Sequence, residues 1–243
     1  MKFKKQPKTF VIGDIHGRYE ALKEVLTKSH FNYEKDLLII LGDVVDGGYD
    51  AYEVVEELIK IKNSVFIFGN HDKWFIQHVK TGWAEDVWLN QGGRNTLESY
   101  TKRKGLLGEQ DGKLIPCTHQ LFFDKALKFF ILNNVAFIHG GFEEKKGLER
   151  TDEETLLWDR SLINLARFRP IKGFEKIFVG HTTTQIYGND LDIKDVLRPL
   201  KFNNLIMMDT GAGWDGVLSI MDVGTEEFWT SSVQTPAVRR QND

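Results

Sequence analysis

The sequence lacks the features that mark secreted, membrane-spanning and nucleic-acid-binding proteins. Its 243 residues include one cysteine, Cys117, which excludes an intramolecular disulfide and fits a reducing compartment. No apolar run is long enough to cross a bilayer, and none follows the basic residues at the start, so we expect neither a membrane span nor a signal peptide. A net charge of −3 attracts a phosphate backbone poorly. We therefore expect a cytoplasmic protein without strong nucleic-acid binding.

Internal repeats, low-complexity tracts and dividing linkers are also missing from the sequence. Hydrophobic residues make up 41% and charged residues 28% of the chain, a composition typical of globular proteins. The length suits one domain over residues 1–243 with a sizeable core. We expect the tail, residues 233–243, to be disordered.

Three early segments each run from an apolar strand into a polar turn. They are residues 9–17 (TFVIGDIHG), 37–48 (LLIILGDVVDGG) and 64–72 (SVFIFGNHD). Amphipathic helices are predicted after the first two, over residues 19–28 and 51–61. Because strands and helices alternate, we expect an α/β fold with a largely parallel sheet and helices outside it.

The later part of the chain predicts a helical insertion followed by a return to strands. Tryptophans and leucines at helical spacing indicate the insertion, over about residues 73–130. Two pairs, Asp50 with Glu53 and Thr151 with Glu154, predict capping boxes at helix starts. The later strands are expected within residues 135–141, 176–182, 204–213 and 216–223.

Residues that can bind metal ions or move protons follow the predicted strands directly. In open α/β sheets these strand ends line the usual ligand crevice. Oxygen and imidazole ligands suit manganese, iron or zinc, and the set is larger than one ion needs. One aspartate can bridge two ions about 3.5–4 Å apart. The residues are Asp14, His16, Asp43, Asp46, Asn70, His71, His139 and His181.

Together, these motifs resemble those of a known enzyme family. The segments GDIHG, GDVVDGG, GNHD, HGG and GHT, in this order, resemble the calcineurin-like metallophosphoesterases. More narrowly, they resemble the phosphoprotein phosphatase branch, which includes phage and bacterial serine/threonine phosphatases and symmetrical diadenosine tetraphosphatases. Thr183 stands where many other members carry a second histidine, which favours this branch. The resemblance implies a metallophosphoesterase-type β-sandwich flanked by helices.

The resemblance also implies a role for each residue at the strand ends. Two divalent metals are implied, manganese first, with iron or zinc as alternatives, and a water bridging them would attack phosphorus in line. His71 would be the general acid that protonates the leaving oxygen, and Asp46 would orient it. The ligands would be Asp14 and His16 for the first metal, Asp43 for both, and Asn70, His139 and His181 for the second.

One position departs from the family pattern. The branch normally carries a phosphate-binding arginine directly after the second aspartate of its second motif, and here that residue is Gly47. We expect Arg160, in the segment WDR, to take over this contact, with Arg94 as its helper. Arg18 is a weaker candidate.

Three functions are consistent with these motifs. The first is a two-metal phosphomonoesterase, a serine/threonine protein phosphatase acting on phosphorylated proteins. The alternative is a hydrolase of dinucleoside polyphosphates, of the diadenosine tetraphosphate type, or of other nucleotides. The third is a module that binds phosphorylated ligands through metals without cleaving them. Gly47 is the only support for the module, and the Asp46–His71 acid pair argues against it, because a binder needs no proton donor.

Overall fold

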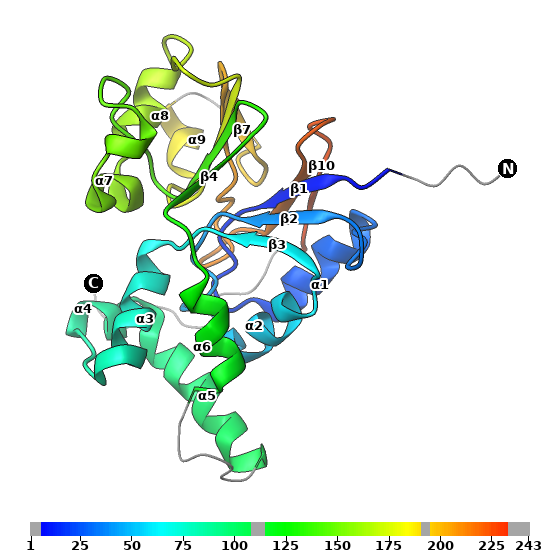
Figure 1. Ribbon diagram of the computed structural model, residues 1–243, viewed down its shortest axis with the longest axis vertical. Coiled ribbons are helices and arrows are strands. Elements are labelled where there is room, and N and C mark those ends of the chain that lie inside the picture. Colours follow the sequence, from blue (N-terminus) through cyan, green and yellow to red (C-terminus); the bar gives the residue numbers. More distant parts are fainter. Residues whose placement is uncertain (1–5, 108–114, 191–194, 233–243) are drawn as a thin grey trace, which may run out of the picture.

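Two mixed β-sheets stack on one another at the centre of the protein. The computed structural model describes residues 6–107, 115–190 and 195–232, so the tail expected to be disordered lies outside the described residues. One sheet has the strand order β10-β9-β1-β2-β3 and the other β4-β5-β6-β8-β7 (Figure 1). The predicted α/β sandwich with flanking helices is confirmed. The strands are β1 Thr9–Ile12, β2 Leu37–Ile40, β3 Asn63–Phe66, β4 Phe129–Leu132, β5 Val135–Ile138, β6 Lys176–Val179, β7 Leu200–Phe202, β8 Leu205–Met207, β9 Ser219–Asp222 and β10 Phe228–Thr230.

Three neighbouring strands of each sheet are parallel, as the alternation of strands and helices predicts. β1, β2 and β3 run parallel in the first sheet, and β5, β6 and β8 run parallel in the second. The outer pairings, with β9 and β10 in the first sheet and with β4 and β7 in the second, are antiparallel. Because parallel strands end at the same edge, the turns that follow them come together there.

Alternate residues of the middle strands face different layers of the core. In β1, Phe10 and Ile12 pack under the helices, whereas Val11 lies in the apolar layer between the sheets. In the second sheet, Phe137 and Phe178 enter that same layer and stack at 5.2 Å between ring centroids. Both faces of these strands are buried, which explains why they appear in the sequence as continuous apolar runs rather than alternating ones.

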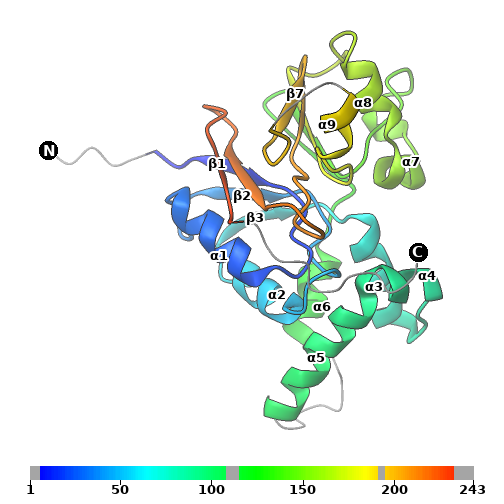
Figure 2. The ribbon, with the colours of Figure 1, turned by 180° about the vertical axis from the view of Figure 1, so that it is seen from behind.

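Helices cover the outer face of each sheet (Figures 1 and 2). The apolar faces of α1 Tyr19–Lys28 and α2 Ala51–Ile59 pack on the first sheet. α7 Glu153–Trp158 and α8 Ser161–Ala166 pack on the second, and α9 Ile186–Asp190 follows β6. No helix in the described part of the chain is long and apolar enough to cross a membrane.

The predicted insertion contains several helices: α3 Asn70–Thr81, α4 Asp86–Trp88, a π-helical turn Leu89–Gly93, α5 Arg94–Leu107 and α6 Cys117–Asp124. Of these, α5 and α6 pack against α2. His119 of α6 is buried and joins α6 to α5 and to α2 through its two ring nitrogens. One nitrogen lies 2.8 Å from the Tyr100 hydroxyl of α5, and the other lies 2.8 Å from Glu56 of α2. The insertion is therefore fixed to the first sheet through α2.

The structure corrects several details of the sequence predictions. Asp50 makes no side-chain cap at α2, which ends at Ile59 rather than at residue 61. At α7 the cap is Asp152, whose carboxylate accepts from Thr155 N at 2.9 Å, whereas the Thr151 hydroxyl donates to the Gly147 carbonyl. The short outer strands β4, β7 and β10 were not predicted. β7 and β10 have only three residues each, and β4 is an apolar run that begins at the end of the expected helical insertion.

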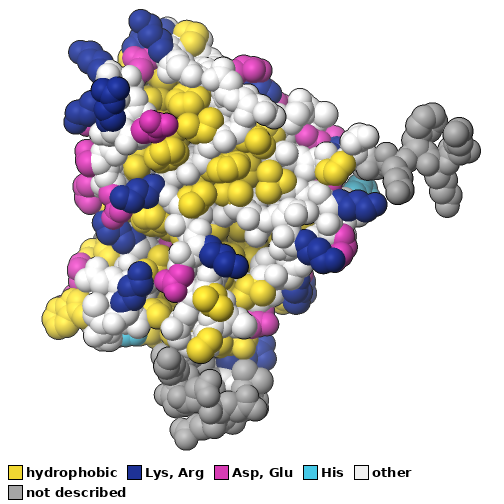
Figure 3. Space-filling view, in the orientation of Figure 1, with side chains coloured by type: hydrophobic (Ala, Val, Ile, Leu, Met, Phe, Trp, Pro, Cys, Tyr) yellow, Lys and Arg dark blue, Asp and Glu magenta, His cyan; other side chains and the backbone are white. Residues whose placement is uncertain are grey.

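The layer between the sheets reaches the surface on one side of the molecule. In Figure 3, hydrophobic side chains gather in the middle of the face that Figure 1 views, over β3 and β4. Val65 of β3 and Phe130 and Leu132 of β4 are only partly buried against the central cluster. β3 and β4 are the outermost strands of their sheets on this side.

Candidate metal centre and active site

The predicted site residues converge because they follow parallel strands. Asp14 and His16 follow β1, Asp43 and Asp46 follow β2, and His139 and His181 follow β5 and β6. Asn70 and His71 are the first two residues of α3, rather than part of an open turn. All eight side chains are buried except that of His181, which is partly exposed.

Several of these residues have an unusual backbone conformation. His16, Asp43, Asp46 and His181 have φ values of 49°, 47°, 69° and 61°, in the left-handed region. This region costs a non-glycine residue about 1–2 kcal/mol. Strain of this kind persists where the surrounding structure imposes it and is concentrated at functional sites. The three turns that hold these four residues are therefore fixed in the positions that direct the side chains into the site.

In the turn before α3, individual residues can be seen to fix the backbone. Gly69 precedes the helix, and a Cβ atom there would lie 2.0 Å from Asp43 Oδ1, so only glycine fits. Asp43 Oδ1 instead accepts a hydrogen bond from His71 N at 3.0 Å. Asp72 joins the same two turns, because its carboxylate accepts from Gly69 N and from Val44 N. The second and third motifs are thus fixed to one another.

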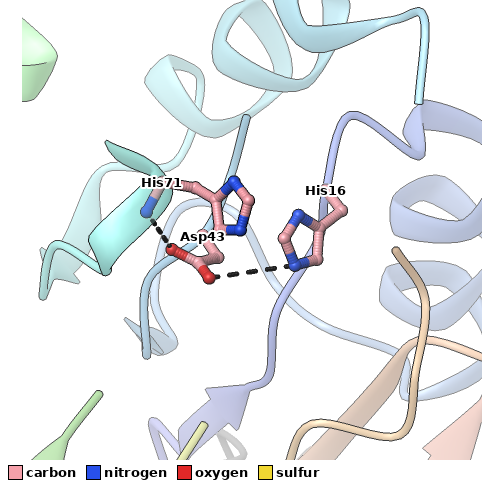
Figure 4. Close-up of side chains that lie close together, drawn as sticks. All are labelled: His16, Asp43 and His71. Atoms are coloured by element: carbon pink, nitrogen blue, oxygen red, sulfur yellow. Dashed lines mark hydrogen bonds and ion pairs between the residues drawn. The ribbon is translucent and has the colours of Figure 1, made fainter. Parts of the chain in front are cut away.

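One group of possible metal ligands consists of His16, Asp43 and His71 (Figure 4). One ligand atom from each lies within 4.8 Å of the others, and His16 Nε2 lies 3.8 Å from Asp43 Oδ2. His16 Nδ1 lies 3.2 Å from the Val45 carbonyl and donates to it, which leaves the lone pair on Nε2 facing Asp43. Burial and the neighbouring His71 lower the pKa of His16 to about 4, so the ring is neutral, as a metal ligand must be.

The second group consists of Asp43, His139 and His181. His139 Nε2 lies 3.4 Å from Asp43 Oδ2 and 3.0 Å from Asn70 Oδ1, and Asn70 Oδ1 lies 2.9 Å from His181 Nδ1. Burial and the adjacent His139 lower the pKa of His181 to about 3. Asp43 belongs to both groups, as the shared ligand of two ions would.

The donor set fits metal binding. His139 Nδ1 donates to the Leu41 carbonyl at 2.8 Å, so Nε2 is the nitrogen that faces two oxygen acceptors. A proton or a cation must lie among them. Burial opposes a charge on His139, but Asp43 outweighs it and raises the pKa of His139 above its usual value. In addition, the buried His181 Nε2 has no hydrogen-bond partner among the described residues. The site therefore has the lone pairs and the negative charge that divalent ions require.

Buried carboxylates beside the two groups add to the negative charge. Asp14 is buried and accepts from His181 N at 3.0 Å, but its oxygens are not part of either group. Burial, with Asp209 and Asp43 nearby, raises the pKa of Asp14 well above its usual value. Burial likewise raises the pKa of Asp209 to about 6. Cations would relieve this repulsion. Asp209 follows β8 as the other aspartates follow their strands, but it was not predicted from the sequence.

The predicted acid pair is in hydrogen-bond contact. His71 Nδ1 lies 2.7 Å from Asp46 Oδ2, and both side chains are buried. Burial opposes a charge on His71, but the carboxylates of Asp43 and Asp46 outweigh it and raise the pKa of His71 to about 9. His71 therefore keeps its proton at neutral pH, and Nε2 is the nitrogen not bound by Asp46.

Two residues of the insertion, missed in the sequence, hold Asp46 in place. Trp88 Nε1 donates to Asp46 Oδ2 at 2.8 Å, and the Thr96 hydroxyl donates to Oδ1 at 2.7 Å. Thr96 Oγ1 also accepts from Asp46 N at 2.9 Å. Both donors are 1% exposed or less. Their spacing from Asp46, 42 and 50 residues, gave no local signal in the sequence.

Trp88→Phe should therefore slow catalysis without removing metal. The ring is largely kept, but Asp46 loses one donor, and a hydrogen bond to a charged group contributes about 1.5–3 kcal/mol. We expect kcat for an alkyl phosphate to fall about 10-fold or more, and kcat for p-nitrophenyl phosphate to change less, because its leaving group needs little protonation. Steady-state kinetics with metal analysis measures this. Trp83→Phe, at a 64% exposed side chain, is the control. Equal losses on both substrates would indicate a packing defect instead.

The structure also accounts for Gly47. Its φ is +76°, and a Cβ atom there would lie 3.2 Å from the Gly213 carbonyl and 3.3 Å from His16 Cβ. Gly92 of the insertion packs so closely that a Cβ on it would be 2.3 Å from Gly47 N, and Asn95 donates to the Gly47 carbonyl. An arginine at this position would need a different backbone.

The candidate replacement arginines lie in different environments. Arg160 is exposed, and its charge contributes to lowering the pKa of His181, after burial and His139, which places it beside the second group. Arg94 is exposed at the start of α5. Arg18 is buried and donates to the Ala212 carbonyl at 3.0 Å, so it holds the turn after β8.

The chain is similar to known proteins over most of its length. Residues 7–206 match the family model described as calcineurin-like phosphoesterase. A symmetrical bis(5'-nucleosyl)-tetraphosphatase of Neisseria gonorrhoeae is 24% identical over 265 residues, covering 90% of this chain and 93% of that protein. A protein of the same name from Buchnera aphidicola is 49% identical over 65 residues, and this match spans 26% of the chain and only 24% of the relative's length.

Solved structures share the fold at low sequence identity. A crystal structure described as that of a candidate diadenosine tetraphosphatase superimposes with a TM-score of 0.64 at 17% identity, covering 93% of this chain and 94% of that chain. A protein serine/threonine phosphatase from Saccharomyces cerevisiae gives a TM-score of 0.55 at 15% identity, covering 98% and 84%. Both similarities concern the fold alone.

Proposed function

The chain belongs to the calcineurin-like phosphoesterase family, and from this premise we propose that it hydrolyses dinucleoside polyphosphates of the diadenosine tetraphosphate type. Family membership and the two buried His/Asp groups identify a metal-dependent phosphoester hydrolase. The substrate is the proposal, and one observation carries it: a symmetrical tetraphosphatase aligns over 90% of the chain. This reverses the order of the two hydrolase functions expected from the sequence.

Two divalent cations fit the site, and we assign their ligands as follows. Asp43 would serve both ions, because its carboxylate belongs to both groups of converging ligand atoms. When bound, the cations would supply an acidic water and neutralise charge on the phosphate. Oxygen and imidazole ligands suit manganese, and also iron or zinc. The ligands would be Asp14, His16 and Asp43 for one ion, and Asp43, Asn70, His139 and His181 for the other. Asp14 is assigned from the motif resemblance, and His71 is left out of the first group of ligand atoms because it keeps its proton.

The chain's own residues then bind the phosphate and move one proton. His71 donates the proton on Nε2 to the leaving oxygen, while Asp46 holds Nδ1–H and stabilises the charged ring. Trp88 and Thr96 keep Asp46 in place from the insertion. Arg160 contacts the phosphate chain in the role that an arginine at position 47 would have.

Protein phosphatase activity remains the second candidate, because of the acid pair. Phosphoserine and phosphothreonine leave as alkoxides, which need a proton, and His71 is arranged to provide one. A nucleoside diphosphate leaves as a phosphate anion, which is far less basic. The same pair argues against a module that only binds phosphorylated ligands.

A substrate panel distinguishes these functions. Metal-reconstituted protein is assayed with diadenosine tetraphosphate, a phosphoserine peptide, p-nitrophenyl phosphate and the matching phosphodiester. We expect the highest kcat/KM for the tetraphosphate. A higher kcat/KM for the phosphopeptide would make protein phosphatase activity the first candidate. Binding without turnover of any substrate would support the binding module.

Arg160→Ala should lower kcat/KM for the tetraphosphate without removing metal. Losing a charged donor to a developing anion typically costs about 10²–10³-fold. Arg94→Ala should cost less, because Arg94 is only the proposed helper. Arg198→Ala, at an exposed side chain paired with Asp195, is the control. The assignment fails if Arg160→Ala keeps more than half of the wild-type kcat/KM.

A further inference from the structure

Two tryptophans connect the proposed acid to the second group of metal ligands. The rings of His71 and Trp74 lie 5.2 Å apart between centroids, those of Trp74 and Trp158 5.5 Å apart, and those of Trp158 and His181 5.4 Å apart. The interplanar angles are 85°, 64° and 89°, so the contacts are edge-to-face rather than stacked. Each indole therefore contacts one histidine of the site.

The pair is built from two distant parts of the chain. Trp74 lies one turn after His71 in α3, and Trp158 ends α7, which packs on the other sheet. Figures 1 and 2 show α3 and α7 on the same side of the molecule. An ion pair between Lys73 and Glu153, at 2.9 Å, also joins these helices. The ring pair thus closes one side of the site across both sheets.

Burial sets this pair apart from the tryptophan of the acid network. Trp88 is 1% exposed and uses its indole nitrogen to hold Asp46. Trp74 and Trp158 are both partly exposed, although each touches a histidine of the site. Arg160 follows Trp158 by two residues and is exposed. Two partly exposed indole rings, inclined at 64° to one another, therefore lie near the cation proposed to contact phosphate.

We propose that Trp74 and Trp158 form an aromatic platform on which one nucleobase of the substrate stacks. The inference rests on the proposed function, since it places a base next to the phosphate chain that this site would cleave. Every base has a π-face, so stacking tolerates different bases. The platform selects for a nucleoside on the phosphate without choosing among adenine, guanine and pyrimidines.

Product inhibition tests the platform separately from the substrate assignment. Inhibition constants for ADP, for ribose 5-diphosphate and for pyrophosphate are measured against hydrolysis of p-nitrophenyl phosphate by the metal-loaded protein. The wild-type enzyme should bind ADP about 10-fold or more tightly than ribose 5-diphosphate, the scale of one base–aromatic stack. Equal constants would overturn the platform, even if diadenosine tetraphosphate is the substrate. If ADP binds more tightly than ribose 5-diphosphate but diadenosine tetraphosphate is not hydrolysed, the platform stands and the proposed function is contradicted.

Variants then locate the stack. Trp158→Leu should raise the ADP constant about 10-fold and the pyrophosphate constant less than 2-fold. Trp158→Phe should restore part of the difference, and Trp74→Leu should act like Trp158→Leu. Trp83→Leu, at a 64% exposed tryptophan, should change neither constant. The platform is rejected if ADP and pyrophosphate weaken by the same factor in the Trp158 and Trp74 variants.

Discussion

Replacing Asp43 by asparagine should remove most of the bound metal and abolish hydrolysis. Asp43 Oδ2 lies 3.4 Å from His139 Nε2 and 3.8 Å from His16 Nε2, so it faces both groups of ligands. Burial would raise the pKa of Asp43, but the imidazoles around it, first that of His139, lower it below the usual value. The carboxylate is therefore ionised, and an amide would remove a charge from both ion sites at once.

The comparison with Asp14→Asn sharpens this prediction. Asp14 is proposed, from the motif resemblance, to serve one ion only, and its oxygens lie outside the two groups of converging atoms that share Asp43. We expect Asp14→Asn to keep about one ion per chain and Asp43→Asn to keep less. Activity of Asp43→Asn should fall more than about 10³-fold, beyond the loss of one charged donor. Metal analysis after desalting, with circular dichroism to check folding, measures this. Two retained ions in Asp43→Asn would contradict a shared ligand.

His71→Asn should keep the metals and slow the chemistry according to the leaving group. For alkyl phosphates, whose leaving oxygen needs a proton, we expect kcat to fall about 10²–10⁴-fold. For p-nitrophenyl phosphate the loss should be much smaller. Asparagine is chosen because it removes the acid while its amide can still contact Asp46, which has Trp88 and Thr96 as further donors.

The same variant bears on the substrate. A nucleoside diphosphate leaves more readily than an alkoxide, so the loss for diadenosine tetraphosphate should fall between the losses for the alkyl and nitrophenyl esters. Kinetics on all three substrates, at equal metal occupancy, gives the order. If His71→Asn slows the alkyl and nitrophenyl esters equally, His71 is not the acid. Asp46→Asn should give the same order, because it acts through His71.

The parts of the fold that the sequence predicts are those buried on both faces. β1, β2, β5, β6 and β8 lie between two apolar layers, so each appears as an apolar run followed by a polar turn. The outer strands do not: β7 and β10 have three residues each and partly exposed side chains. The cap of α7 was misplaced by one residue because Thr151 and Asp152 are both good caps, and only the geometry shows that Asp152 is the one used.

The residues of the site also differ in whether the sequence predicts them. Residues that follow a strand directly, such as Asp43 and His139, could be found because the position after a strand is itself informative. Asp209 has this position too, but it was not predicted, because the glycines after it are also typical of an ordinary tight turn. Trp88 and Thr96 could not be found, because a helical pattern predicts that a residue is buried and not which carboxylate, 42 or 50 residues away, it contacts.

The products formed from diadenosine tetraphosphate test the central claim most directly. Metal-loaded protein is incubated with the compound, and the nucleotides are separated by chromatography at low conversion. Symmetrical cleavage of a four-phosphate chain gives two molecules of ADP and no other nucleotide, and Asp43→Asn should give none. ATP and AMP in equal amounts, or no turnover by protein that hydrolyses a phosphoserine peptide, would contradict the account.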